Sequence, residues 1–318
     1  MKRALVLSGG GSKGAFEAGA IANLVNKKKL DFQLITGTSV GALNAAFLGQ
    51  ARNFKELQEL VKELTATWLG IKGNRCIYRS GLLGNLWRIL RHGALYSPSG
   101  LWDLIRRKID PARLFHPRTV VKVTVVSFET GKLLCADSRQ PAFHQDYLTY
   151  VLASASMPFF FPAVPIAGQH WYDGGLRDLT PLATAIKEDP DEIIAITTFP
   201  LSPNLEATMP PGRPGNALQA ILRTVEILLS EIAVNDLQLA QAINKAWWRY
   251  PGKKPIPIQI IAPAKPLPGH ALSFDPDQIR ANLKAGYEAA EKPRCLAMNR
   301  YPAPATPPPP TFKKHISE

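Results

Sequence analysis

The chain has 318 residues, of which 46% are hydrophobic and 20% charged, and this composition is that of an ordinary globular protein with a sizeable core. Its 38 Lys and Arg against 25 Asp and Glu give a formal net charge of +13, which favours an anionic partner, either nucleic acid or an acidic lipid surface. Its three cysteines, Cys76, Cys135 and Cys295, are widely spaced and match no metal-ligand pattern, so we expect reduced thiols, no metal and a cytoplasmic location.

The first elements follow a β-α-β-α order. A short strand at 2–7 leads into a glycine-rich loop, and residues 15–28 have helical composition. A buried strand at 32–36 and a small-residue helix at 42–48 follow at once. This order predicts an α/β fold with a mostly parallel central sheet and right-handed crossovers. The apolar run at the amino end stops at Ser8, so we expect no secretion signal.

The remaining elements alternate in the same way. In chain order they are a helix at 53–69, a strand at 120–128 that turns at 129–131 into a strand at 132–135, a helix at 145–155, an irregular segment at 157–162, a strand at 193–197, a proline-rich connection at 200–215, a helix at 217–248, a strand at 256–261 and a helix at 276–291. The helix at 217–248 has apolar residues at helical spacing, which predicts a major core-packing face: Leu218, Ile221, Leu222, Val225, Leu228, Leu229, Ile232 and Leu239. We assign 1–292 to one domain and 293–318 to a disordered or extended tail, because six prolines fall between 302 and 310.

Residues 72–118 form a basic insert. Ten Lys and Arg against two Asp give this segment a net charge of +8, and aromatic residues are interleaved with the charges: Tyr78, Trp87, Tyr96, Trp102 and Phe115. Such a segment suits a lid or a surface that contacts anionic lipid headgroups. A solvated helical insert whose aromatic residues face the core fits the pattern equally. The segment has no nucleic-acid-binding signature, so nucleic acid is not the partner we expect.

A candidate nucleophile stands in the run Gly37-Thr38-Ser39-Val40-Gly41. A Gly-x-Ser-x-Gly run between a strand and a helix forms a sharp turn that holds the serine hydroxyl out at its tip. Side chains at Gly37 and Gly41 would collide with neighbouring backbone in such a turn. Ser39 is therefore the predicted nucleophile.

A candidate base and a candidate anion site accompany this serine. Asp173, before Gly174 and Gly175, follows Trp171 and Tyr172, and partial burial would raise its pKa enough to accept the proton of Ser39. The run Gly9-Gly10-Gly11-Ser12-Lys13-Gly14 presents backbone amides at a helix start, where they could stabilise an oxyanion. Gly10 and Gly11 are the predicted donors.

The glycine loop also fits the dinucleotide-binding pattern Gly9-x-Gly11-x-x-Gly14. That reading needs an acidic residue at the end of the second strand, and Asp31 instead precedes that strand. A non-catalytic, basic lipid- or nucleotide-binding protein that uses the loop is the alternative function. His270 is the candidate for a third catalytic residue if the dyad were in fact a triad.

The three motifs in this order resemble the patatin-like phospholipase family in its bacterial form, and the block at 152–158 is similar to a further motif of that family. The resemblance covers roughly residues 3–200. It implies a three-layer α/β/α fold, a Ser39–Asp173 dyad without histidine, an oxyanion hole at Gly10 and Gly11, and hydrolysis of fatty acyl esters of lipids with no cofactor. Where the family often has Asn before a proline, this chain has Leu176-Arg177-Asp178-Leu179-Thr180-Pro181. We expect part of the acyl-chain wall at 157–161, with Val164 and Ile166, and a cytoplasmic enzyme that can make peripheral contact with an anionic membrane.

Overall fold

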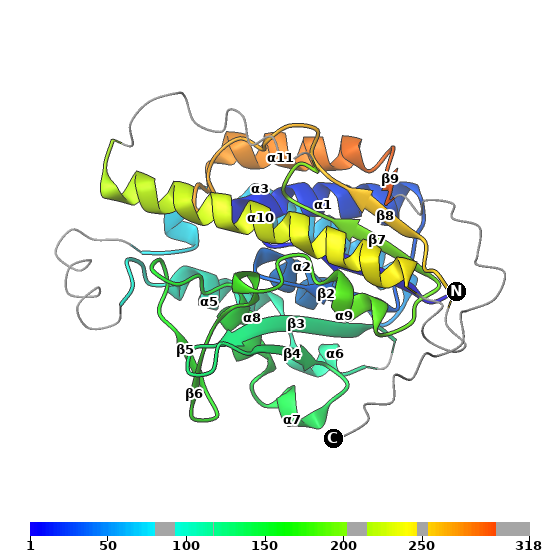
Figure 1. The fold of residues 1–318 in the computed structure, drawn as a ribbon, viewed down its shortest axis with the longest axis horizontal. Coiled ribbons are helices and arrows are strands. Elements are labelled where there is room, and N and C mark those ends of the chain that lie inside the picture. The colour runs from blue at the N-terminus through cyan, green and yellow to red at the C-terminus, as the bar shows by residue number, and fades with distance from the viewer. Residues whose placement is uncertain (80–92, 117, 202–214, 247–253, 297–318) are drawn as a thin grey trace, which may run out of the picture.

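A mixed sheet of nine strands organises the part of the chain that this computed structural model describes, namely residues 1–79, 93–116, 118–201, 215–246 and 254–296 (Figure 1). The strand order is β5-β6-β3-β2-β1-β7-β8-β9, and β4 pairs with β3. Strands β3, β2, β1, β7 and β8 are parallel, and the outer strands are antiparallel to their neighbours. The strand bounds are β1 Arg3–Leu7, β2 Leu34–Gly37, β3 Val120–Ser127, β4 Leu133–Asp137, β5 Val164–Ile166, β6 Gln169–Asp173, β7 Glu192–Ile196, β8 Ile258–Ile261 and β9 Arg294–Cys295.

Helices cover both faces of the sheet. Alternate residues of β1 point to opposite faces, as in any strand. Leu5 and Leu7 pack into the larger core cluster, formed with α1 (Gly14–Ala22), α2 (Val40–Leu48), α3 (Phe54–Gly70), α5 (Ser99–Lys108), α8 (Tyr147–Ser154) and α11 (Pro276–Ala289). Ala4 and Val6 pack into the second cluster, with α9 (Leu182–Ile186) and α10 (Ala217–Lys245). The predicted three-layer α/β/α fold is confirmed, and Figure 1 shows α10 crossing the sheet on the side opposite α1 and α11.

Short elements complete the chain. Two of them, α6 (Pro111–Leu114) and α7 (Pro141–His144), are single helical turns that begin at a proline. The others are three 3₁₀ turns and a π-helical turn that continues α1: η1 Gly11–Lys13, η2 Asn23–Lys27, η3 Asn74–Cys76 and η4 Gly174–Leu176. The prediction that the tail starts at 293 is wrong, because Arg294 and Cys295 pair with β8 as strand β9. Residues 297–318 of that tail lie outside the described residues, as do residues 202–214 of the connection predicted at 200–215.

The long helix α10 is less buried than its apolar spacing predicts. Leu229, Ala233, Leu237 and Ala240 are buried, but Ile221, Leu228 and Leu239 are exposed, the latter two by 57% and 52%. The apolar residues of this helix are therefore not confined to the face that packs against the rest of the protein. Our prediction that they form one core-packing stripe is therefore wrong for the outward-facing residues.

The aromatic residues of the basic insert that the structure describes pack inward. Tyr78 is buried and stacks at a tilt on Tyr96 with ring centroids 4.5 Å apart, while Trp102 and Phe115 pack partly buried against the core. Their burial matches the expectation of a helical insert whose aromatic residues face the core. Trp87 lies outside the described residues.

Candidate active site

The turn between β2 and α2 holds Ser39 in a strained conformation. Its φ of 57° and ψ of −127° are rare for a residue with a side chain. Both flanking glycines are sterically required, because a Cβ at Gly37 would lie 2.3 Å from the carbonyl oxygen of Gly41, and a Cβ at Gly41 would lie 2.4 Å from that of Leu7. The backbone N–H of Ser39 donates to Ser154 Oγ at 2.9 Å. These contacts present the hydroxyl of Ser39 to the cavity that the residue lines.

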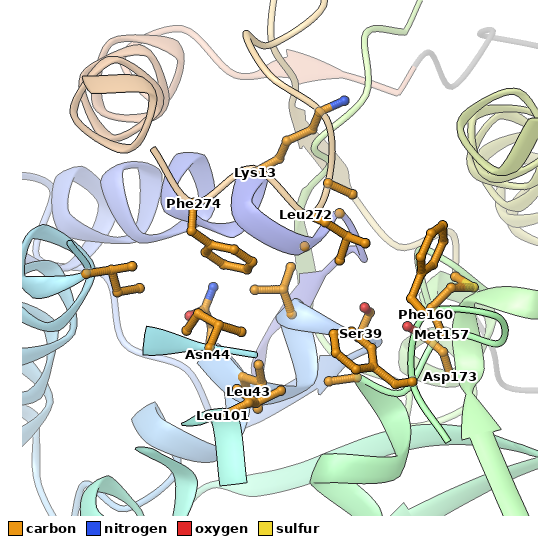
Figure 2. Close-up of a pocket in the computed structure, with 18 of the residues that line it drawn as sticks. Lys13, Ser39, Leu43, Asn44, Leu101, Met157, Phe160, Asp173, Leu272 and Phe274 are labelled. Atoms are coloured by element: carbon orange, nitrogen blue, oxygen red, sulfur yellow. The ribbon is translucent and has the colours of Figure 1, made fainter. Parts of the chain in front are cut away.

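Asp173 ends β6 and is buried, with 1% of its surface exposed. Its Oδ1 accepts the Gly175 N–H at 2.7 Å, while Oδ2 is buried with no hydrogen-bond partner of good geometry. Burial raises the pKa of Asp173 from 3.8 to about 7, although the Gly175 amide and the nearby Ser39 hydroxyl oppose that rise. Figure 2 shows the Ser39 and Asp173 side chains beside each other. A carboxylate with this pKa can accept a proton at neutral pH.

Strand pairing explains why residues so far apart in sequence meet. Strand β4 occupies one edge of β3 along Lys122–Val126, so β2 and β6 must share the other edge. Strand β2 runs parallel to β3 and β6 antiparallel to it, so their carboxyl ends face each other. Gly37 is opposite Val123 and Asp173 is opposite Val125. The serine turn and the aspartate therefore emerge two residues apart along β3.

The glycine loop after β1 lines the same cavity through Gly10 and Gly11. Its outer amides are already bonded, because Gly9 N–H donates to Leu179 O at 3.0 Å and Ser12 N–H donates to Ala271 O at 2.7 Å. No hydrogen bond within the described residues involves the amides of Gly10 and Gly11. Gly11 has a φ of 59°, and a Cβ on it would lie 2.0 Å from the carbonyl oxygen of Ala271. The two predicted donors are therefore the amides of the loop that remain free.

The other predicted glycines lie where side chains do not fit. A Cβ on Gly9 would meet Leu179 at 2.4 Å, one on Gly14 would meet Val40 at 2.2 Å, and one on Gly174 would meet Thr124 at 2.3 Å. Gly175 is close to both Leu179 and Asp173 Oδ1. These glycines allow the glycine loop, the serine turn and the aspartate loop to pack against one another.

Sequence reasoning missed the role of the end of helix α8. Ser154 accepts the Ser39 amide, and the Ser156 carbonyl oxygen accepts the Asp173 N–H at 3.1 Å. One helix end thus holds the backbones of both candidate catalytic residues. The family-like block at 152–158 was the available signal, but the sequence did not indicate what it contacts.

An apolar cavity extends away from Ser39 and Asp173. Helices α2, α3, α5 and α10 and several loops supply its wall. Met157, Phe160 and Phe161 belong to it as predicted, but Pro158 and Phe159 do not line it. Val164 and Ile166 do not line it; they are buried in β5 instead. Figure 2 shows Leu43, Leu101 and Phe274 at a distance from the serine. A cavity with mostly apolar lining residues is typical of a site for an apolar ligand.

The structure places neither rival candidate in hydrogen-bond contact with Ser39 or Asp173. Asp31 precedes β2 and binds Arg118 at 2.6 Å, at the opposite edge of the sheet from the glycine loop. His270 lines the cavity, but no hydrogen bond within the described residues joins it to Ser39 or Asp173, and its Nδ1 faces the Leu272 amide at 3.3 Å. Burial lowers the pKa of His270 below its ordinary value. The dinucleotide-binding hypothesis therefore lacks the acidic residue that it requires at the end of β2, and the triad hypothesis lacks a hydrogen bond from His270 to Ser39 or Asp173 among the residues that the structure describes.

The described residues contain neither a metal-binding cluster nor a membrane-spanning helix. Among them, no cluster of three or more His, Cys, Asp and Glu could hold a metal ion. Likewise, none of the described helices combines the length and apolar character needed to span a bilayer.

Comparison with known proteins shows relatives in sequence and in structure, and a family to which the chain belongs. It is similar to the uncharacterized protein YjjU of Escherichia coli (strain K12), with 26% identity over 296 residues that cover 89% of this chain and 74% of YjjU. Among solved structures it is similar to VipD from Legionella pneumophila, with 15% identity and a TM-score of 0.46 over 91% of this chain and 66% of VipD. It is also similar to ExoU of Pseudomonas aeruginosa in its complex with SpcU, with 17% identity and a TM-score of 0.29 over 76% of this chain and 52% of that chain. This chain thus spans less than two thirds of the length of either solved chain. The model of the patatin-like phospholipase family matches residues 5–186, more than half of the sequence, and the chain belongs to that family.

Proposed function

We propose that this protein hydrolyses fatty acyl esters of lipids through an acyl-Ser39 intermediate. Family membership supports lipid hydrolysis at the level of the family. The observation that carries the finer proposal is the meeting, at one end of an apolar cavity, of Ser39, a buried Asp173 and two free amides.

Acylation begins when Ser39 Oγ attacks the ester carbonyl carbon and its proton passes to Asp173. The carbonyl oxygen gains the negative charge and accepts hydrogen bonds from the Gly10 and Gly11 amides, each of which contributes about a hundred- to a thousandfold in rate. The intermediate collapses, the ester C–O bond breaks, and the leaving alcohol takes the proton from Asp173.

Deacylation repeats the sequence with water. Asp173 accepts a proton from a water molecule as its oxygen attacks the acyl carbon. Collapse of the second intermediate breaks the bond to Ser39 Oγ, which recovers the proton, and the fatty acid leaves. Asp173 serves as base and then as acid in both halves, and a pKa of about 7 suits both tasks.

The cavity points to the substrate class. Most of its wall is aliphatic and aromatic, so binding energy comes from burial of the acyl chain. The net charge of +13 supports the further proposal that a cytoplasmic enzyme meets anionic membranes at their surface. Vesicle binding that fails to increase with anionic lipid, or fails to weaken with salt, would contradict that part.

Fluorophosphonate labelling and release of a chromogenic medium-chain ester test the proposal. Ser39→Ala should lose both activities, and Asp173→Asn should lower the labelling rate about a hundredfold or more. Asp137→Asn is the matched control, because Asp137 is also buried but forms ion pairs with Lys122 and Arg139 away from the cavity. His270→Gln that loses all labelling would favour a triad. A folded wild type that binds lipid or nucleotide but neither labels nor turns over would favour the non-catalytic alternative.

A further inference from the structure

The loop at 177–181 joins three parts of the site that are distant in sequence. The Leu179 carbonyl oxygen accepts the Gly9 N–H at 3.0 Å, and the Thr180 hydroxyl donates to Ser8 Oγ at 3.0 Å, which ties the loop to the glycine loop. The Asp178 carbonyl oxygen accepts the Thr38 hydroxyl at 2.9 Å, beside the nucleophile. The loop itself continues from the turn that follows Asp173.

The side chain of Leu179 fills the centre of this junction. It is 1% exposed and lies against both Gly9 and Gly175, where even a Cβ would collide with it. A shift of Leu179 would therefore move the glycine loop and the turn after Asp173 together.

Asp236 on helix α10 holds this loop from the other side. Its Oδ2 accepts the N–H groups of both Leu179 and Thr180, each at 2.8 Å. A single carboxylate oxygen that accepts two backbone amides fixes both the position and the orientation of that backbone. Asp236 also lies outside residues 5–186, the part of the chain that the family model matches.

We propose that Asp236 is a positioning residue for the hydrolase: it fixes the loop at 177–181 and so sets the distance between the Gly10 and Gly11 amides and Ser39. This inference rests on the proposed function. Asp236 does not line the acyl cavity and acts only through the backbone that it binds. Its loss should therefore lower kcat and leave KM nearly unchanged, since displacement of reacting groups by about 1 Å can cost about a hundredfold in rate.

The same helix supplies a matched control. Asn244 is buried on α10, and its side chain also binds two backbone groups, accepting the Ile256 N–H at 2.8 Å and donating to the Ile256 carbonyl oxygen at 2.7 Å. Ile256 precedes β8, and it does not line the acyl cavity. Asp236→Leu and Asn244→Leu each leave two backbone groups without partners, so both should lower stability, but only the first should disturb the site.

The experiment measures kcat, KM and melting temperature for wild type, Asp236→Leu, Asp236→Asn and Asn244→Leu with the chromogenic ester. We expect Asp236→Leu to lower kcat at least tenfold with KM within about twofold, and Asn244→Leu to keep kcat within about twofold. Asp236→Asn keeps an acceptor oxygen and should recover most of the kcat. If Asp236→Leu does not fold, Asp236→Ala compared with Asn244→Ala provides the same contrast.

The outcomes separate the two proposals. A folded wild type without Ser39-dependent turnover refutes the proposed function, and this inference with it. An active wild type whose Asp236 and Asn244 variants lose kcat equally, or whose Asp236→Leu variant keeps full kcat, refutes the positioning role alone. Failure of Asp236→Asn to recover kcat also refutes it, since the role needs an acceptor at this position.

Discussion

Asp173→Asn should abolish turnover and yet stabilise the fold at neutral and alkaline pH. Burial raises the pKa of Asp173 from 3.8 to about 7 in the folded protein, whereas the unfolded chain keeps the ordinary value. As pH rises, the unfolded chain therefore releases this proton first, and the stability of the folded state falls between about pH 4 and pH 7. A shift of about three pKa units corresponds to about 4 kcal/mol at pH values above 7.

Asparagine carries no charge to desolvate, and its side-chain oxygen can still accept the Gly175 N–H that Asp173 accepts at 2.7 Å. The free energy of unfolding of Asp173→Asn, relative to wild type, should increase by about 2 to 3 kcal/mol from pH 5 to pH 8.5. Urea unfolding followed by tryptophan fluorescence at the two pH values measures this. A difference between variant and wild type that is the same at both pH values would refute the reasoning.

Asp137→Asn is a control, because the pKa of Asp137 is shifted in the opposite direction from that of Asp173. Ion pairs and hydrogen bonds with Arg139 and Lys122 outweigh burial and hold the pKa of Asp137 below its ordinary value. An acid with a lowered folded pKa contributes stability above its unfolded pKa, and this contribution is lost as pH falls through the folded pKa. Asp137→Asn should therefore destabilise the protein at both pH 5 and pH 8.5.

Three further predictions concern turnover. Because the base must be ionised, kcat/KM should rise about a hundredfold from pH 5 to a plateau, with an apparent pKa near 7, and a flat profile from pH 5 to 9 would contradict the role of Asp173. Ser154→Ala removes the acceptor of the Ser39 amide and should lower kcat about tenfold with little change in KM; unaltered kcat would show that this contact is dispensable. Leu229→Trp narrows the acyl cavity and should shift the kcat/KM preference about tenfold from dodecanoyl to butyryl esters, and an unchanged ratio would place the acyl chain elsewhere.

The parts of the site that the sequence predicts are those governed by local sterics. The glycines around Ser39 and in the loop at 9–14 are adjacent to the groups they serve, so the turn, the free amides and the strand-helix order can be inferred from residue types alone. The central parallel strands are also recognisable, because strands that are buried on both faces are runs of apolar residues. The meeting of Ser39 with Asp173 was inferred from motif order, and the shared edge of β3 gives its physical cause.

Contacts between distant segments were not predictable. Asp236 binds a loop 56 and 57 residues earlier, and nothing in the spacing of α10 distinguishes it from a solvent-facing acid. Periodicity likewise predicts an apolar stripe on α10 but does not show that Leu228 and Leu239 face outward. In the basic insert, two ring partners of Tyr78, Phe161 and Phe274, lie far along the chain, so composition alone could not decide between a core and a membrane surface.

Because carboxyl groups around the site are buried, activity and stability should be favoured at different pH values. Burial raises the pKa of Glu17, Asp173, Asp178 and Asp236, so each destabilises the fold increasingly as pH rises through the folded pKa. A histidine base avoids this conflict, because its neutral form is the one that accepts a proton. A carboxylate is basic enough only when desolvation makes its ionised form costly. We therefore expect kcat/KM to be highest above pH 7 and the melting temperature to be highest below it. Coincident optima, with both quantities measured from pH 5 to 9, would contradict the assignment of a desolvated carboxylate as the base.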